Sequence, residues 1–142
     1  MIVYADTSFL IAVYLRDVHS SEAYRLMALR PSLTITPFGR AEVANAVYRQ
    51  VFLQRTSAMN ARTAWQNFEL DCRSGLLHST ELPEATWSEV IELARRHGPT
   101  LGVRTLDSLH VACALELKAD KFWTFDDRQK QLAEAVGLDV AP

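Results

Sequence analysis

Four acidic residues of this chain lie in contexts where a carboxylate is unusual. Asp6 and Asp126 each come directly after a short, largely apolar segment, residues 2–5 and 122–125 respectively. Glu42 and Asp107 each interrupt a helical pattern that is otherwise almost entirely apolar. A carboxylate is rarely buried unless it is paired or coordinates an ion. These four residues are therefore the candidates for a functional site.

A purely structural role is the simpler explanation for three of the four when each is taken alone. Asp6 could cap the helix that follows it, and Asp126 could be an ordinary turn residue. Asp107 lies near a predicted helix N-terminus, where the helix dipole favours negative charge. Taken together, however, and placed at the carboxyl ends of predicted strands, where ligands bind in parallel sheets, the residues favour one shared site.

Glu42 is harder to explain structurally, because it lies in mid-helix among alanines and valines, although Arg40 or Arg49 could pair with it. Converging carboxylates repel one another and raise one another's pKa values, and a divalent cation removes that repulsion. Ligation by oxygen alone favours Mg²⁺ or Mn²⁺ over zinc, and none of the four histidines has the paired spacing of a zinc site. The chemistry predicted is metal-assisted attack of water on a phosphodiester.

Short strands alternate with helices along the whole chain. Residues 2–5 are apolar without a polar break, as expected of a buried central strand, and Thr7 or Ser8 is the expected cap of the helix that runs to Leu15. Further strands are predicted at 33–36, 76–79, 122–125 and 138–140, and helices at 22–29, 37–54, 58–74, 83–97, 105–117 and 128–136. Thr36 and Thr105 are the expected caps of the helices at 37–54 and 105–117, and Gly75 is the expected stop of the helix at 58–74. This alternation predicts an α/β fold with a mostly parallel sheet.

The composition fits one globular domain, residues 1–142, with 49% hydrophobic residues and a net charge of −2. The charge argues against a broad basic surface for nucleic acid but leaves room for a nucleic-acid enzyme with an acidic site. No apolar segment is long enough to span a bilayer and no signal peptide is evident, so we expect no membrane contact and a cytoplasmic location. Cys72 and Cys113 are expected to be small buried hydrophobic residues.

Four segments, in this order and at these separations, resemble the PIN domain. They are Val3-Tyr4-Ala5-Asp6-Thr7-Ser8, Ala41-Glu42-Val43 after Thr36-Pro37, Arg104-Thr105-Leu106-Asp107-Ser108-Leu109-His110, and Thr124-Phe125-Asp126. In particular, the chain is similar to the toxin component (VapC-like) of prokaryotic toxin–antitoxin pairs. Each segment alone is a weak signal, whereas the ordered set is specific and covers essentially the whole chain.

The resemblance implies a three-layer α/β/α sandwich and a ribonuclease that depends on Mg²⁺ or Mn²⁺. It implies that Asp6 and Asp107 are the firmest metal ligands, that Glu42 completes the ligand set or activates water, and that Asp126 assists a second metal ion. The hydroxyl groups at Ser8 and Thr124 occupy positions that usually support such a cluster. The adjacent Asp127 is an alternative to Asp126, although the spacing from Thr124 favours Asp126.

The resemblance also implies a homodimer and an antitoxin partner that covers the active site, bound in a groove formed by the first two helices and the helix pair at 37–74. Two alternatives stay open at the level of sequence. One is a PIN nuclease that processes RNA without an antitoxin, and the other is a catalytically silent module that binds RNA or protein.

Contacts with the substrate are less well specified. Arginines in or near the four segments could hold phosphates, with Arg104 the best candidate among Arg16, Arg40, Arg49, Arg104 and Arg128. His110 lies one helical turn after Asp107, and we expect it to be a packed, hydrogen-bonded side chain and not a metal ligand.

Overall fold

Strand β1 (Ile2–Ala5) lies at the centre of a five-stranded sheet in the computed structural model, which describes residues 1–142. The other strands are β2 (Ser32–Ile35), β3 (Leu77–Ser79), β4 (Lys121–Trp123) and β5 (Val140–Ala141). Their order across the sheet is β3-β2-β1-β4-β5, and every neighbouring pair is parallel. The predicted parallel sheet is confirmed.

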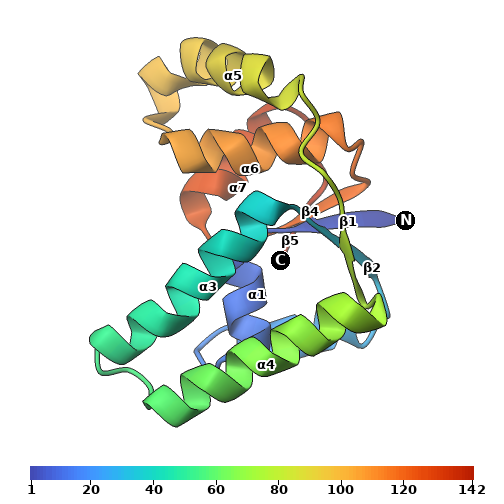
Figure 1. Cartoon of the computed structure of the whole chain (residues 1–142). Coiled ribbons are helices and arrows are strands. Elements are labelled where there is room, and N and C mark those ends of the chain that lie inside the picture. The colour runs from blue at the N-terminus through green and yellow to red at the C-terminus, as the bar shows by residue number, and fades with distance from the viewer.

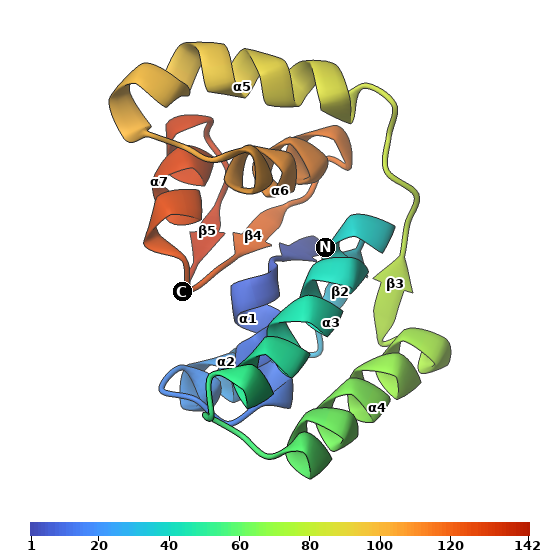
Figure 2. The same ribbon diagram turned by 60° about the vertical axis from the view of Figure 1, so that its left-hand side comes forward.

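Helices cover both faces of this sheet (Figure 1). They are α1 (Thr7–Tyr14), α2 (Ser20–Met27), α3 (Pro37–Phe52), α4 (Ala58–Ser74), α5 (Thr86–Leu101), α6 (Thr105–Glu116) and α7 (Asp127–Ala135). The turned view in Figure 2 shows α5, α6 and α7 on one side of the sheet and α1 to α4 on the other. None of these helices is long and apolar enough to cross a membrane.

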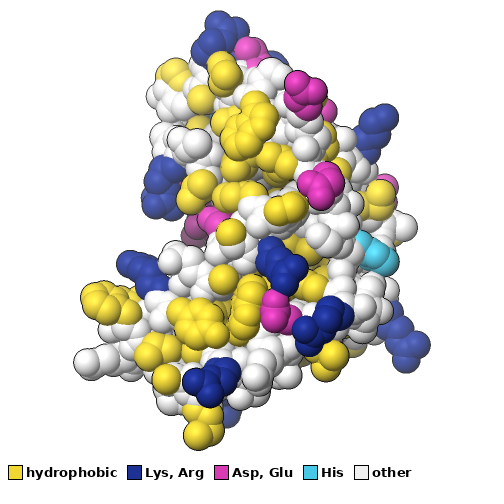
Figure 3. All heavy atoms as spheres, in the orientation of Figure 1, with side chains coloured by type: hydrophobic (Ala, Val, Ile, Leu, Met, Phe, Trp, Pro, Cys, Tyr) yellow, Lys and Arg dark blue, Asp and Glu magenta, His cyan; other side chains and the backbone are white.

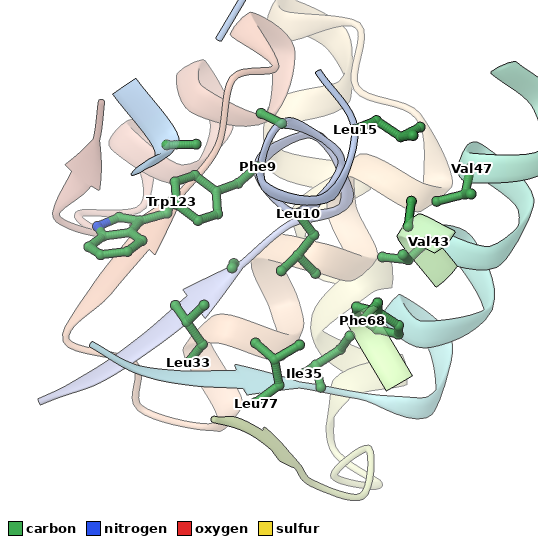
Figure 4. Packing of buried hydrophobic residues seen from close by; sticks show 14 of the residues in the cluster. Phe9, Leu10, Leu15, Leu33, Ile35, Val43, Val47, Phe68, Leu77 and Trp123 are labelled. Atoms are coloured by element: carbon green, nitrogen blue, oxygen red, sulfur yellow. The ribbon is translucent and has the colours of Figure 1, made fainter. Parts of the chain in front are cut away.

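Alternation of side chains along the strands produces two separate cores. Val3 and Ala5 of β1 face the core formed with α1 to α4, whereas Tyr4 faces the core formed with α5, α6 and α7. Figure 4 shows the first core, where Leu10 of α1 points toward the sheet and Phe9 points toward Trp123 of β4. The expected three-layer α/β/α sandwich is therefore confirmed.

The helix starts and stops follow local chemistry, with two corrections to the predicted caps. Thr36 caps α3 as predicted, since its Oγ1 accepts from the amide of Gly39 at 3.2 Å. The first helix is capped not by Thr7 or Ser8 but by Asp6, whose Oδ1 accepts from the amide of Phe9 at 2.9 Å. Thr105 is likewise the first residue of its helix and not the cap.

The predicted end of the fifth helix near residues 97–99 is wrong. Helix α5 continues through Pro99 to Leu101, and its cap is Gly102, which has a φ of 60° and donates its amide to the carbonyl of Gly98 at 2.9 Å. A proline disfavours helix at the preceding residue. Here that preference is overridden because Val90 and Leu93 bury the helix against the second core, and the left-handed glycine sets the end.

Candidate active site

The carboxyl ends of β1 and β4 lie side by side at the point where the strand order reverses. From β1 the chain proceeds outward through β2 and β3, and it then returns to the other side of β1 to form β4 and β5. Ligands of open parallel sheets bind at such a switch point. A cleft of about 820 Å³ lies there, and its lining includes the acidic residues Glu42, Asp107 and Asp126. We call it the acidic cleft; Figure 3 shows acidic atoms in an indentation between the two helical layers.

Asp6 lies beneath the acidic cleft and is fully buried. Its Oδ1 accepts from the hydroxyl of Ser8 at 2.7 Å and from the amide of Phe9 at 2.9 Å, while its Oδ2 accepts from Thr124 Oγ1 at 2.6 Å. Burial raises the pKa of Asp6, and nearby His110 together with these donors offsets only part of that increase. The site residue expected at the end of β1 thus supports the cleft from below.

Glu42 projects from the middle of α3 and is half-buried. Its Oε2 accepts two hydrogen bonds, one from Thr7 Oγ1 of α1 at 2.7 Å and one from His110 Nε2 of α6. Its Oε1 has no hydrogen-bond donor in the protein. Burial raises the pKa of Glu42, but His110 and Thr7 outweigh that effect and lower the pKa below its usual range.

The possible pairing of Glu42 with Arg40 or Arg49 is wrong. Arg40 forms an ion pair with Glu69 of α4, and Arg49 is an exposed residue in the lining of the acidic cleft. The side chain that pairs with Glu42 instead is His110, which is 1% exposed. The expectation that His110 is packed and hydrogen-bonded is therefore confirmed.

Asp107 lies in the first turn of α6 and is buried. Its Oδ2 accepts from the backbone amide of Arg104 at 3.1 Å and from Arg104 Nε at 3.3 Å. Its Oδ1 has no donor. Asp107 therefore lies at a helix N-terminus, which alone would explain an acidic residue there, and it also lines the acidic cleft.

Asp126 caps α7, since its Oδ1 accepts from the amides of Arg128 at 2.9 Å and Gln129 at 3.0 Å. Its Oδ2 has no donor. Asp127 is exposed and does not line the acidic cleft, although it borders a smaller hollow together with Asp126. The placement of the two residues favours Asp126 as the member of the site.

Among the acidic side chains that line the cleft, Glu42, Asp107 and Asp126 share one feature: each has one carboxylate oxygen held by protein donors and one that is free. Oxygen atoms of this kind are what Mg²⁺ and Mn²⁺ prefer as ligands. As placed, no three His, Cys, Asp or Glu side chains form a complete ligand set. The donor chemistry nevertheless fits a hard divalent cation, which Glu42, Asp107 and Asp126 would hold above the buried Asp6.

Some residues of the site escaped sequence analysis. Thr7 donates a hydrogen bond to Glu42, and in the sequence only its position next to Asp6 indicates that it belongs to the site. Tyr4 contacts His110 across 106 residues of sequence, which no local pattern reveals. The ring of His19 stacks on that of Phe125, with centroids 4.3 Å apart, and both residues line the cleft.

Comparison with known proteins assigns the family. The PIN domain model matches residues 3–135, so the chain belongs to the PIN domain family. No sequence among curated proteins matches it significantly.

Several solved structures share the fold. VapC20 of Mycobacterium tuberculosis, a Sarcin-Ricin loop cleaving toxin, has a TM-score of 0.73 and 20% identity over 99% of each chain. VapBC2 from Rickettsia felis, bound to a DNA fragment from their promoter, has a TM-score of 0.68 and 14% identity over 99% of this chain and 98% of that one. FitAcB from Neisseria gonorrhoeae has a TM-score of 0.67 and 16% identity over 100% and 97%.

Proposed function

We propose that this PIN-domain protein is a metal-dependent RNA endonuclease and the toxin of a toxin–antitoxin pair. The observation that carries the proposal is the acidic cleft at the switch point, where three helices each present a carboxylate with one free oxygen. The structural likeness to VapC20, a Sarcin-Ricin loop cleaving toxin, supports RNA as the substrate.

The acidic residues of the site would have different roles according to their positions. Glu42, Asp107 and Asp126 would hold Mg²⁺ or Mn²⁺. Asp6, expected from the resemblance as one of the firmest ligands, is fully buried with both oxygens held by protein donors, so we assign it to the support of the site. An ion held there would polarise the phosphodiester and lower the pKa of the attacking water. Each acid is oriented by its own donors, so the free oxygens keep a fixed direction.

Two exposed arginines lie in the lining of the cleft, Arg49 on α3 and Arg104 before α6. Their guanidinium groups would bind phosphates of the RNA backbone, and they offset the negative charge that repels RNA from the acids. Arg104 also contacts Asp107, so it connects the phosphate contact with the proposed metal site.

The test is cleavage of a labelled RNA as Mn²⁺ is titrated, for the parent and for Asp6→Asn and Asp107→Asn. Loss of one essential charged group is expected to lower the rate by about 10²–10³. Glu81→Gln, which removes an exposed acidic group outside the cleft, is the charge-matched control and should cleave like the parent. If both aspartate variants cleave like the parent, the proposal fails. Mn²⁺ that does not bind in calorimetry favours a silent binding module instead.

A second hollow supports an antitoxin partner. It has a volume of about 610 Å³ and lies along α1, α3 and α4. It shares Ile11, Asp17 and Gln50 with the acidic cleft, so the two hollows are continuous along α1. A polypeptide arm bound in this hollow can therefore extend into the acidic cleft and cover it. We also propose a homodimer, as the family resemblance implies.

Co-expression with the protein encoded next to this gene tests the pairing. The expected result is a stable complex that no longer cleaves RNA, and for the isolated chain a mass in solution of twice 16.0 kDa. Replacing Asn67, which lines the second hollow, by arginine should weaken the complex without affecting cleavage. A chain that cleaves RNA but neither binds nor is inhibited by its neighbour is an RNA-processing nuclease without an antitoxin.

A further inference from the structure

A chain of three side chains runs from the second core to the acidic cleft. Tyr4 of β1 and His110 of α6 are each 1% exposed, and the hydroxyl of Tyr4 lies 3.0 Å from His110 Nδ1. On its other side, His110 Nε2 contacts Glu42 Oε2. The chain therefore joins a buried strand residue to a carboxylate in the lining of the cleft.

The direction of the hydrogen bond between His110 and Glu42 follows from the chemistry of the two groups. The ionised carboxylate of Glu42 can only accept, so His110 Nε2 carries the proton that it donates. On its other side, His110 Nδ1 shares a hydrogen bond with the Tyr4 hydroxyl at 3.0 Å. Tyr4, His110 and Glu42 thus form one continuous hydrogen-bonded chain.

Glu42 depends on these partners in a way that the other cleft acids do not. Asp126 and Asp107 lie at helix N-termini, where free backbone amides hold one of their oxygens. Glu42 lies in mid-helix, where the amides are already paired within α3. Its donors come from two other helices, Thr7 of α1 and His110 of α6.

Both donors bind the same oxygen. Thr7 and His110 converge on Oε2, so the carboxylate is held in one rotation and Oε1 alone is left for the cleft. A glutamate side chain has three rotatable bonds, and without these contacts it would sample several orientations. Because the Glu42 side chain is already fixed, metal binding does not have to supply the entropy cost of ordering it.

Aromatic packing holds the chain itself in place. The ring of Tyr4 stacks on Phe122, with centroids 5.6 Å apart and an interplanar angle of 2°. The imidazole of His110 meets the edge of Tyr4 at 5.8 Å and packs against Phe38 at 4.8 Å. His110 therefore presents Nε2 to Glu42 from a rigid position.

We propose that His110 is a positioning residue that fixes Glu42 for divalent metal binding, and that Tyr4 fixes His110. The inference rests on the proposed function, because it concerns the metal site of the same nuclease. It is tested by the affinity for Mn²⁺ in the absence of RNA, which is independent of cleavage. Outer partners of metal ligands typically contribute about 10–100-fold to metal affinity.

The experiment compares Mn²⁺ binding by the parent, His110→Leu, His110→Gln and Tyr4→Phe, measured by calorimetry together with a thermal melt. His110→Leu removes the donor and is expected to weaken Mn²⁺ binding about 10–100-fold. His110→Gln places an amide N–H near the position of Nε2 and should restore part of the affinity. Tyr4→Phe removes only the hydroxyl and should weaken binding less than His110→Leu, and it keeps the test decisive if His110→Leu does not fold.

Leu132→Ala is the control for stability, because Leu132 is fully buried in the same core and has no contact with Glu42. It should melt earlier and bind Mn²⁺ like the parent. Folded His110→Leu and Tyr4→Phe that both bind Mn²⁺ like the parent overturn the proposal, and so does an equal loss of affinity in Leu132→Ala. A parent that binds Mn²⁺ but does not cleave RNA contradicts the proposed nuclease function alone, whereas a parent that binds no Mn²⁺ contradicts both.

Discussion

Thr124 donates a hydrogen bond from Oγ1 to Oδ2 of Asp6 at 2.6 Å, although the two residues are 118 positions apart in the chain. The same hydroxyl oxygen accepts from the amide of Asp126 at 2.9 Å. One threonine therefore holds a buried acid at the end of β1 and the backbone of another acid after β4. These hydrogen bonds join the chain after β1 to the chain after β4 at the switch point of the sheet.

Thr124→Val keeps the shape of the side chain and removes both hydrogen bonds. The expected result is a loss of about 10–100-fold in RNA cleavage, because the support of a metal-binding group is removed. Stability should fall by about 1–3 kcal/mol, since the hydrogen bond from Thr124 lowers the pKa of the buried Asp6 and its loss leaves that charge less compensated. Urea unfolding and the cleavage assay measure the two effects.

The matched control for this substitution is Thr86→Val at the start of α5. Thr86 is also fully buried, but its Oγ1 has no hydrogen-bond partner. Replacing an unpaired buried hydroxyl by a methyl group removes a desolvation cost, so stability should be equal to the parent or higher. If Thr124→Val and Thr86→Val have the same effect, the importance assigned to the Thr124–Asp6 contact is wrong.

Asp126 and Asp127 provide a second pair of matched substitutions. Asp126→Asn keeps an oxygen that can cap α7 but removes the charge in the cleft, and cleavage should fall by about 10²–10³. Asp127→Asn removes an exposed charge outside the cleft and should cleave within about twofold of the parent, since exposed substitutions of this kind have small effects. The reverse order of activities would assign the site to Asp127.

Much of this architecture was predictable from sequence because its signals are local. The Thr36-Pro37 pair predicts the start of α3, and Gly75, with a φ of 82°, ends α4 as expected. The proline rule, by contrast, predicted the end of α5 too early, because packing against the second core carries this helix through Pro99.

The partners of the acids were not predictable, because they are long-range contacts between helices that pack only in the folded chain. Glu42 has Arg40 and Arg49 on its own helix, yet it pairs with a histidine 68 residues away. The burial of Asp6 below the cleft follows from Ser8 and Thr124 closing over it, which a pattern of apolar and polar residues cannot reveal.

Arg49 should contribute to binding of RNA and not to the chemical step. Arg49→Gln is expected to raise KM and leave kcat unchanged, because a contact to a distant phosphate acts equally in the ground state and the transition state. The dependence of binding on salt should also become shallower by about one counterion. Arg62→Gln, an exposed arginine of α4 outside the acidic cleft, is the control and should change neither quantity. A drop in kcat with KM unchanged would contradict the role assigned to Arg49.

Tyr14 of α1 forms a hydrogen bond with α4, and it should make the stability of the fold depend on pH in the alkaline range. Its hydroxyl donates to Asp71 Oδ2 at 2.7 Å, and burial, followed by this hydrogen bond and the charge of Asp71, raises the pKa of Tyr14 well above its usual value. Tyr14→Phe removes the hydrogen bond, so at pH 8 it should be less stable than the parent by about 1–2 kcal/mol.

The sign of the pH dependence follows from the raised pKa of Tyr14. An unfolded tyrosine loses its proton near pH 10, whereas Tyr14 in the folded protein keeps it. Above about pH 10 the unfolded state therefore binds fewer protons than the folded state, and the stability that this residue contributes falls as the pH rises. Urea unfolding at pH 8, 9 and 10.5 should show the advantage of the parent over Tyr14→Phe constant at the first two values and smaller at the third. Because all other titrating groups are common to both proteins, an advantage that stays the same at pH 10.5 would mean that Tyr14 ionises in the folded state as readily as in the unfolded one, contrary to its contact with Asp71.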